Sequence, residues 1–231
     1  MTRVLALDTS TWIGGVALVE AVPDAEPRTV IELTVDVRDS HADHVLRRID
    51  WLLAEAGWDK SSLDIYAATR GPGSFTGIRV GLGTVRGLSL STGRPGVGET
   101  TLRALAEAHG PAEGPRLALM EAGRRELYGA GFDAEGSPAE PLDEPWLEAR
   151  AELEARTNGK PWVVIPGPGT LLDPAELPQV ARVAAAPRGI AAAVGRLVLA
   201  RDLAALESES LAPLYIRPPD AVLKRKKGLN S

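Results

Sequence analysis

The chain has 231 residues, of which 44% are hydrophobic, and a formal net charge of −5. This length fits one large domain or two small ones and is enough to bury a core. Cysteine is absent, which excludes disulfides and thiolate zinc sites. The negative charge argues against a broad basic face that coats nucleic acid. We find no signal peptide and no apolar segment of membrane-spanning length, and we expect a cytoplasmic protein with no membrane partner.

Three short β-branched and apolar segments open the chain, at Val4–Asp8, Gly15–Val19 and Thr29–Val35. Their short connections predict an antiparallel meander. Ser40, with an acidic residue three positions later, predicts the start of a helix that ends at Gly57. The apolar positions of this helix recur at helical spacing: Val45, Leu46, Ile49, Leu52, Leu53 and Ala56.

The next elements alternate between strand and helix. We predict a strand over Leu63–Thr69, a helix from Thr76 to Leu90, and a short strand at Val97. A further helix begins at Thr100 or Thr101 and runs through residue 108. The order strand, strand, strand, helix, strand, helix, strand, helix is that of a ribonuclease-H-like unit, which has a mixed sheet with helices packed on it.

A shorter and less regular set of elements follows. Arg116–Ala122 and Glu126–Phe132 are predicted to be paired strands, and Trp162–Ile165 is predicted to be another strand. An alanine-rich helix is predicted over Arg188–Leu206, before a closing segment at 213–217. A complete set followed by a degenerate one indicates tandem duplication of a single unit.

We therefore predict an α/β protein made of two tandem ribonuclease-H-like lobes. The first lobe covers residues 1–109 and the shorter, degenerate one covers 110–217, with the boundary in the Gly- and Pro-rich stretch 110–115. Residues 218–231 form a basic tail that includes Lys224–Lys227. This tail is either a solvated, flexible end or a contact for a polyanion.

A glycine-dense turn leads from the predicted strand ending at Thr69 into the helix that follows it. Glycine inside a helix costs about 1 kcal/mol relative to alanine. The helix nevertheless contains four glycines, which suggests that another backbone comes very close to it. These glycines are Gly77, Gly81, Gly83 and Gly87.

Three interpretations of the glycine turn stay open: a tight strand-to-helix turn, a cradle for an anion, or a contact with a partner. A P-loop is excluded, because no lysine stands between Gly71 and Gly93. A nucleophile elbow is also excluded, because Gly73 is followed directly by Ser74.

The three histidines, His41, His44 and His109, give little support for a metal site. His41 and His44 lie three residues apart at the start of a predicted helix, but the acidic residue nearby, Asp43, points to another side of that helix. We expect no metal and no catalytic triad.

Two lobes with an aspartate after the first strand resemble the superfamily of actin, the Hsp70 ATPase domain and hexokinase. Five motifs, in this order, make the chain similar to the TsaB family over nearly its whole length. They are Leu7-Asp8-Thr9-Ser10-Thr11, His41, Arg70-Gly71-Pro72-Gly73-Ser74-Phe75-Thr76-Gly77-Ile78-Arg79, Met120–Tyr128 and Pro213–Arg217.

The resemblance implies a non-catalytic scaffold of the bacterial machinery that makes threonylcarbamoyladenosine in tRNA. It implies a TsaD-like catalytic subunit and a TsaE-like ATPase as partners, contact with tRNA only through the complex, no cofactor, and a homodimer in isolation. It also places the partner face on the helices near 41–56 and 76–90. The expected partner-binding residues are Val45, Leu46, Ile49, Gly77, Ile78, Gly81, Leu82 and Val85.

The alternative is an ATP-dependent small-molecule kinase of the same superfamily, in which Asp8 would position magnesium and phosphate. Trp12, a bulky residue in what would be the phosphate turn, argues against nucleotide binding. The Gly167-Pro168-Gly169 turn stands where a nucleotide-binding relative would present backbone amides, and proline removes one of these donors. We interpret Asp8 as a carboxylate that stabilises its own turn.

Overall fold

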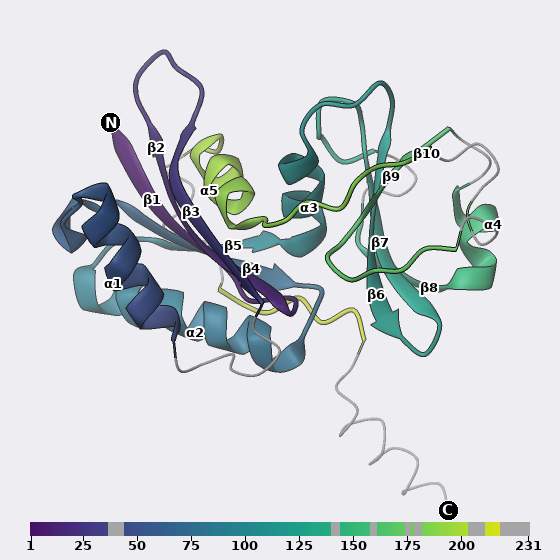
Figure 1. Ribbon diagram of the computed structural model, residues 1–231, viewed down its shortest axis with the longest axis horizontal. Coiled ribbons are helices and arrows are strands. Elements are labelled where there is room, and N and C mark those ends of the chain that lie inside the picture. Colours follow the sequence, from purple (N-terminus) through teal and green to yellow (C-terminus); the bar gives the residue numbers. More distant parts are fainter. Residues whose placement is uncertain are drawn as a thin grey trace, which may run out of the picture.

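A computed structural model describes residues 1–36, 44–139, 144–157, 161–173, 177, 182–202 and 211–217. Within these residues the chain forms two five-stranded mixed sheets, with helices packed beside and between them (Figure 1). This confirms the predicted α/β class.

The first sheet contains β1 (Thr2–Asp8), β2 (Ile13–Ala21), β3 (Arg28–Asp36), β4 (Ile65–Gly71) and β5 (Gly96–Thr100). The first three strands pair antiparallel, as the predicted meander requires. β4 pairs parallel to β1, and β5 parallel to β4, so that the order across the sheet is β3-β2-β1-β4-β5. The carboxyl ends of β1 and β4 therefore lie at the same edge of the sheet.

Two helices cover one face of this sheet, α1 (Val45–Ala56) and α2 (Phe75–Thr92). A short helix, η1 (Lys60–Ser62), connects α1 to β4. Among the described residues, no helix has both the length and the apolar character needed to cross a bilayer. The buried apolar residues of the two helices pack on the sheet: Val45, Ile49, Leu52, Leu53, Ile78, Leu82 and Val85.

The ends of these helices follow from local chemistry. Ser74 caps α2, because its side chain accepts a hydrogen bond from the amide of Gly77. Gly57 ends α1 in the left-handed conformation, with a φ of 64°. At the other end of α1, His44 stands at the N-cap position without a side-chain hydrogen bond. The predicted cap, Ser40, lies outside the described residues.

The second sheet contains β6 (Arg116–Gly123), β7 (Glu126–Phe132), β8 (Trp146–Ala149), β9 (Val163–Pro166) and β10 (Arg182–Val183). Its order, β10-β9-β6-β7-β8, repeats the order of the first sheet, with β6 in the place of β1. The directions repeat as well, since β6, β7 and β8 are antiparallel and β9 and β10 are parallel additions. The sequence did not predict β8 and β10, which are short strands. The origin of the second set by duplication stays a prediction.

Two short helices, η2 (Arg150–Glu152) and α4 (Leu153–Thr157), follow β8 and cover the outer side of the second sheet. Leu153 of α4 joins a separate core with Trp146 and Trp162. The indole of Trp162 donates a hydrogen bond to the carbonyl of Thr157, which satisfies its one polar atom inside this core.

Two further helices, α3 (Thr101–His109) and α5 (Ala191–Leu199), lie between the sheets (Figure 1). The sequence placed α5 in the second lobe, but its small residues pack on the first sheet. At Gly195 a Cβ would lie 2.5 Å from Cγ2 of Val19. The helix begins three residues later than predicted, and residues 203–206 lie outside the described part of the chain. The two sheets thus share one core, and the division at residue 110 stays a prediction.

Candidate functional site

The turn between β1 and β2 rests directly on the start of α2. The hydroxyl of Thr9 donates a hydrogen bond of 2.7 Å to the carbonyl of Gly77. A Cβ on Gly77 would overlap the carbonyl oxygen of Thr9, and a Cβ on Gly81 would overlap its hydroxyl. The close approach predicted from the glycines is therefore real at these two positions. It is made by the chain's own first turn, which accounts for both glycines without a partner, and the contact of Gly77 and Gly81 with a partner stays a prediction.

The glycine turn is bonded to the same first turn. Pro72 follows a cis peptide bond, and the amide of Ser74 donates to the carbonyl of Ser10 at 2.7 Å. A Cβ on Gly73, whose φ is 152°, would overlap that carbonyl. The amide of Gly77 donates to the hydroxyl of Ser74 at 3.2 Å. Because these amides already have acceptors, the geometry favours a tight turn over an anion cradle.

Asp8 ends β1 and is fully buried. Its Oδ1 atom accepts hydrogen bonds from the amide and hydroxyl of Ser10, at 2.9 and 2.6 Å, and from the hydroxyl of Thr69, at 2.9 Å. Burial raises the pKa of Asp8, the hydrogen bonds from Ser10 and Thr69 oppose that rise, and the charge of Glu32 adds to it. The bonds to its own turn and to β4 agree with the stabilising role interpreted from the sequence.

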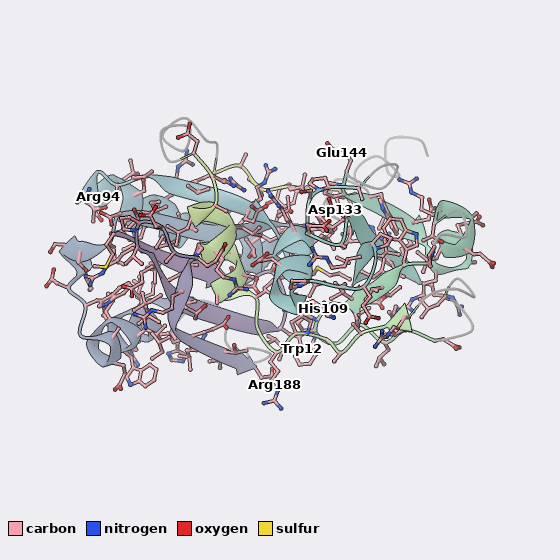
Figure 2. All side chains as sticks on the ribbon, turned by 90° about the horizontal axis from the view of Figure 1, so that it is seen from above. Trp12, Arg94, His109, Asp133, Glu144 and Arg188 are labelled. Atoms are coloured by element: carbon pink, nitrogen blue, oxygen red, sulfur yellow. The ribbon has the colours of Figure 1, made fainter. Side chains whose placement is uncertain are left out.

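A cleft of about 460 Å³ opens next to this turn, between the two sheets, and Trp12 stands in it. A Cβ on Gly169, whose φ is 75°, would overlap the indole of Trp12. The two features that the sequence singled out, the bulky turn residue and the Gly167–Gly169 turn, are thus in contact. Figure 2 shows Trp12 at one edge of the molecule, between the two halves. The indole therefore forms one wall of the cleft, beside the first turn and against Gly169.

The described residues offer no metal centre. They contain no group of three or more His, Asp or Glu side chains placed to hold one ion. His44 lies at the start of α1, whereas His41 and Asp43 lie outside the described residues. The groups at this site are backbone amides that already have hydrogen-bond acceptors and the indole of Trp12, which packs against Gly169.

The C-terminal segment, residues 211–217, crosses the same region and contacts both sheets. The amide of Leu214 donates to the carbonyl of Arg70, at the end of β4, at 2.7 Å. At the second sheet Arg217 forms an ion pair with Glu126 and donates to the carbonyl of Ala122 at 2.5 Å. The segment therefore links the glycine turn to the β6–β7 hairpin.

Tyr215 in this segment holds a side chain of α2 in place. Its ring stacks on Phe75 with centroids 5.0 Å apart, and its hydroxyl accepts a hydrogen bond of 2.9 Å from Nε of Arg79. The Arg79 guanidinium lies 3.8 Å above the ring of Phe75. These contacts add a cation–π pair at the exposed start of α2.

Four of the five motifs meet at this junction, although they are far apart in the sequence. The first turn, the glycine turn, the β6–β7 hairpin and the C-terminal segment contact one another there. Sequence reasoning did not predict the contacts of Tyr215 and Arg217. The sequence signal that could have predicted these contacts is an aromatic residue and an arginine in a short segment that belongs to no predicted helix or strand.

The predicted partner-binding residues separate into two groups. Most of them point into the chain's own core, and their contact with a partner stays a prediction. The helical periodicity that selected them marks the face toward the sheet. Only Leu46 is exposed, at 60%. The buried ones are Val45, Ile49, Ile78, Leu82 and Val85.

The outward side of α2 has a different character. Gly83 and Gly87 are exposed, and a Cβ on either would meet nothing within 4 Å. Leu90, one turn further, is 80% exposed. On α1, Leu46 and Trp51 are also exposed. We call Leu46, Trp51, Gly83, Gly87 and Leu90 the outer helix surface. Within the described chain no contact explains its glycines.

Comparisons with known proteins agree on one pathway. Residues 35–155 match the family model of TsaD, the tRNA N6-adenosine threonylcarbamoyltransferase. The tRNA threonylcarbamoyladenosine biosynthesis protein TsaB of Haemophilus influenzae is 39% identical over 45% of this chain and 42% of its own length. The protein of the same name from Escherichia coli is 33% identical over 56% of this chain and 54% of its own length. The matched segment thus spans about half of these relatives.

A solved structure extends the likeness to the whole fold. A Pseudomonas aeruginosa protein described as similar to the peptidase YeaZ superposes with a TM-score of 0.73 at 25% identity. That match covers 94% of this chain and all of the other. A second structure, YeaZ from the same organism, gives a TM-score of 0.70 at 26% identity.

Proposed function

Because this chain belongs to the TsaB/YeaZ family, we propose that it takes part in threonylcarbamoyladenosine biosynthesis as a non-catalytic subunit that binds a TsaD-like enzyme. In this proposal the TsaD-like partner performs the transfer to tRNA, and this chain acts in the bacterial cytoplasm as its scaffold and activator.

The observation that carries the non-catalytic part of the proposal is the contact between Trp12 and Gly169. The indole lies against Gly169 and lines the cleft between the first turn and the Gly167–Gly169 turn. Asp8 is buried, and its Oδ1 is used by Ser10 and Thr69. A bulky ring beside the first turn and an Asp8 oxygen already engaged in hydrogen bonds both support the proposal that the chain does not bind a phosphate and its magnesium ion there.

We place the partner contact on the outer helix surface. Leu46 and Leu90 are large apolar side chains that the chain leaves exposed, and Gly83 and Gly87 leave α2 without side chains on that side. A bare helix side lets another helix approach closely and gain dispersion contacts along its length. The same surface would serve a homodimer in isolation.

The other partners follow from the same assembly. A TsaE-like ATPase would join this chain and the TsaD-like subunit, and tRNA would be bound only by the complex. The formal net charge of −5 supports this, because a chain of that charge gives little attraction of its own to the phosphate backbone.

The first test is reconstitution. The TsaD-like protein of the same organism is assayed for threonylcarbamoyl transfer to tRNA with and without this chain. We expect co-purification of the two proteins and transfer only when both are present. Full transfer by the TsaD-like protein alone, or no association of the two, would contradict the proposal.

The second test concerns the surface. Gly83→Leu adds a side chain to the outer helix surface without touching the core, so the chain is expected to fold and to lose most of its TsaD-like binding. Gly114→Leu is the matched control, because Gly114 lies before β6 and its Cβ would make only an ordinary contact of 3.8 Å. Binding is measured by light scattering after size-exclusion chromatography. Equal binding by both variants would exclude this surface.

The kinase alternative makes the opposite prediction. A small-molecule kinase would turn over ATP without any partner, and Asp8→Asn would abolish that turnover. We expect no turnover by the isolated chain, and none from Trp12→Gly, which widens the cleft but adds no magnesium ligand. ATP-dependent phosphorylation of a small alcohol by the wild-type chain would favour the kinase.

A further inference from the structure

A second cleft, of about 490 Å³, opens where β5, the start of α3 and β7 come together. It shares no lining residue with the cleft at Trp12. Figure 2 places Glu144, at the rim of this cleft, and Trp12 at opposite edges of the molecule. Its volume is within the range of small-molecule sites, roughly 300–1,000 Å³. We call it the arginine cleft, after Arg70, Arg103 and Arg201, which line it.

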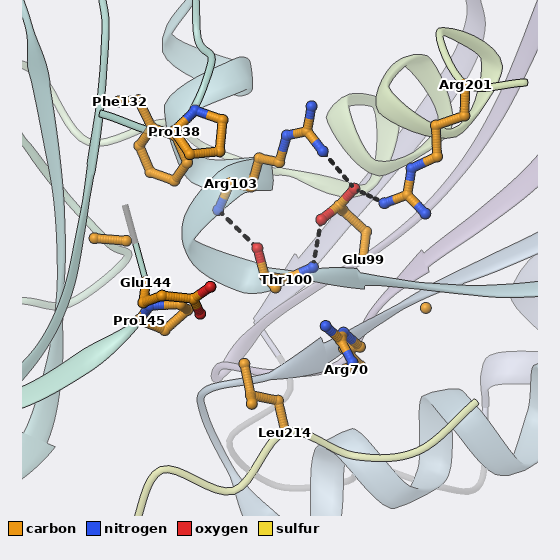
Figure 3. Close-up of a pocket in the computed structure, with 12 residues that line it drawn as sticks. Arg70, Glu99, Thr100, Arg103, Phe132, Pro138, Glu144, Pro145, Arg201 and Leu214 are labelled. Atoms are coloured by element: carbon orange, nitrogen blue, oxygen red, sulfur yellow. Dashed lines mark hydrogen bonds and ion pairs between the residues drawn. The ribbon is translucent and has the colours of Figure 1, made fainter. Parts of the chain in front are cut away.

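Two of the arginines share one buried carboxylate. Glu99 is 2% exposed and forms ion pairs with Arg201 and, at 3.8 Å, with Arg103 (Figure 3). Its other oxygen accepts a hydrogen bond of 2.6 Å from the amide of Thr100. Glu99 therefore holds both guanidinium groups at the cleft.

The third arginine has no such role. Within the part of the chain that the structure describes, no ion pair or hydrogen bond is formed by the guanidinium of Arg70. Its aliphatic stem lies on Gly98, where a Cβ would come within 3.0 Å of Cδ of Arg70. Glycine at position 98 therefore leaves the room that the Arg70 side chain occupies. The fold therefore makes room for the Arg70 side chain, although its guanidinium stabilises no other group of the described chain.

Arg103 adds an unsatisfied donor. Its Nε atom is buried and has no hydrogen-bond partner among the described residues. A buried donor without an acceptor costs about 1–3 kcal/mol, so the fold holds Arg103 in this place at some cost to stability. The other wall contains Phe132, Pro138 and Pro145, which are apolar (Figure 3).

The balance of charge in the cleft is positive. Its lining contains three arginines against two glutamates, the buried Glu99 and the exposed Glu144, and the N-terminus of α3, the positive end of the helix dipole, lies at the same place. Guanidinium groups bind phosphate through paired N–H donors, and a phosphate offers enough oxygens for donors that come from several elements.

We infer that the arginine cleft binds the phosphate group of a small ligand of nucleotide size, with Arg70 as the main contact and the Phe132 wall against the apolar part. A small ligand is favoured over RNA, because a cleft of this volume encloses one molecule and the net charge of −5 provides no extended basic surface for a backbone. This inference does not depend on the proposed function.

The test uses the full chain and two probes, inorganic pyrophosphate and adenosine 5′-monophosphate, titrated without magnesium in a phosphate-free buffer. Arg70→Gln is expected to weaken binding by about tenfold or more, the ratio that the loss of one charge-assisted hydrogen bond gives. Its fold should be unaffected, because the guanidinium has no partner in the described chain. Arg182→Gln, an equal loss of charge on exposed β10, is the matched control and should bind like the wild type.

A second pair of variants tests the sign of the effect. Glu144→Gln removes a competing negative charge from the rim and should tighten binding of both probes severalfold. Glu99→Gln should do the same, if thermal melting shows that it folds. Binding that none of Arg70→Gln, Arg103→Gln and Glu144→Gln changes would overturn the inference.

Two further outcomes would also overturn it. If neither probe binds the wild-type chain at millimolar concentration, the cleft is not a phosphate site. If a short single-stranded RNA binds in an Arg70-dependent way and the small probes do not, the cleft belongs to a nucleic-acid surface. None of these results would affect the TsaD-binding test, whose variant lies on the opposite side of α2 from the sheet.

Discussion

The two faces of α2 contain the same unusual residue for different reasons. On the inner face, Gly77 and Gly81 leave room for Thr9, which bonds to the helix backbone. On the outer face, Gly83 and Gly87 have nothing near them in the described chain. The inner pair of glycines is therefore required for the fold. By our proposal, the outer pair is required for assembly with a partner. The difference is measurable, because a methyl group added to either face should change stability with opposite signs.

The largest effect is expected at Gly77. Gly77→Ala would force the Thr9 carbonyl away from α2 and break its contact with the helix, so we expect a loss of about 3 kcal/mol in the free energy of unfolding. Urea denaturation followed by circular dichroism measures it. Wild-type stability in this variant would mean that the first turn does not rest on the helix.

A smaller loss, about 1–2 kcal/mol, is expected for Gly81→Ala, since here the overlap is with a hydroxyl that can rotate away. Thr9→Ala removes that hydroxyl, so Gly81→Ala should cost little in the Thr9→Ala background. The double-mutant cycle isolates the contact. Additive losses would show that something other than Thr9 restricts Gly81.

On the outer face the sign reverses. Gly83→Ala should stabilise the isolated chain by about 1 kcal/mol, the difference in helix propensity, because the added methyl meets nothing. Gly87→Ala should behave alike. Thermal melting of each variant checks this, and destabilisation would reveal a contact that the monomer hides. A gain in stability together with weaker binding of the TsaD-like partner would indicate that these glycines serve the contact with that partner.

The smallest change in stability is expected for Asp8, which stands at the start of the first turn. Burial raises the pKa of this carboxyl in the folded chain, so its contribution to stability is present below the ordinary carboxyl pKa and is lost as pH rises through the raised value. Asp8→Asn keeps an oxygen for Ser10 and Thr69 but does not ionise. Its stability relative to the wild type should therefore increase with pH across that window, as denaturant titrations at several pH values would show. A pH-independent difference would contradict the assignment.

Local patterns predicted most of the elements, because strands and helices here have clear periodicity. The meander, the α2 helix and the β6–β7 pair all occur where the sequence placed them. β8 and β10 were missed, since strands of four and two residues are too short to show alternation.

The site was harder to predict than the fold. Periodicity identified an apolar face on each helix but could not tell whether a sheet or a partner covers it, and the sheet covers Val45 and Ile78. The sequence singled out Trp12 and the Gly167–Gly169 turn separately, and only the structure shows that they touch. The contact of Tyr215 with Arg79 joins residues too far apart for any local pattern.

The position of α5 has a consequence for how the protein is made. The helix lies late in the sequence, yet Ala191, Ala192 and Gly195 cover Ala17 and Val19 of the first sheet. A ribosome delivers the chain from its N-terminus, so this face of the sheet emerges long before its cover. A fragment that ends near residue 110 would leave an apolar sheet surface in water. The two halves are thus separate in topology, yet the first half becomes fully folded only when synthesis of the second is nearly complete.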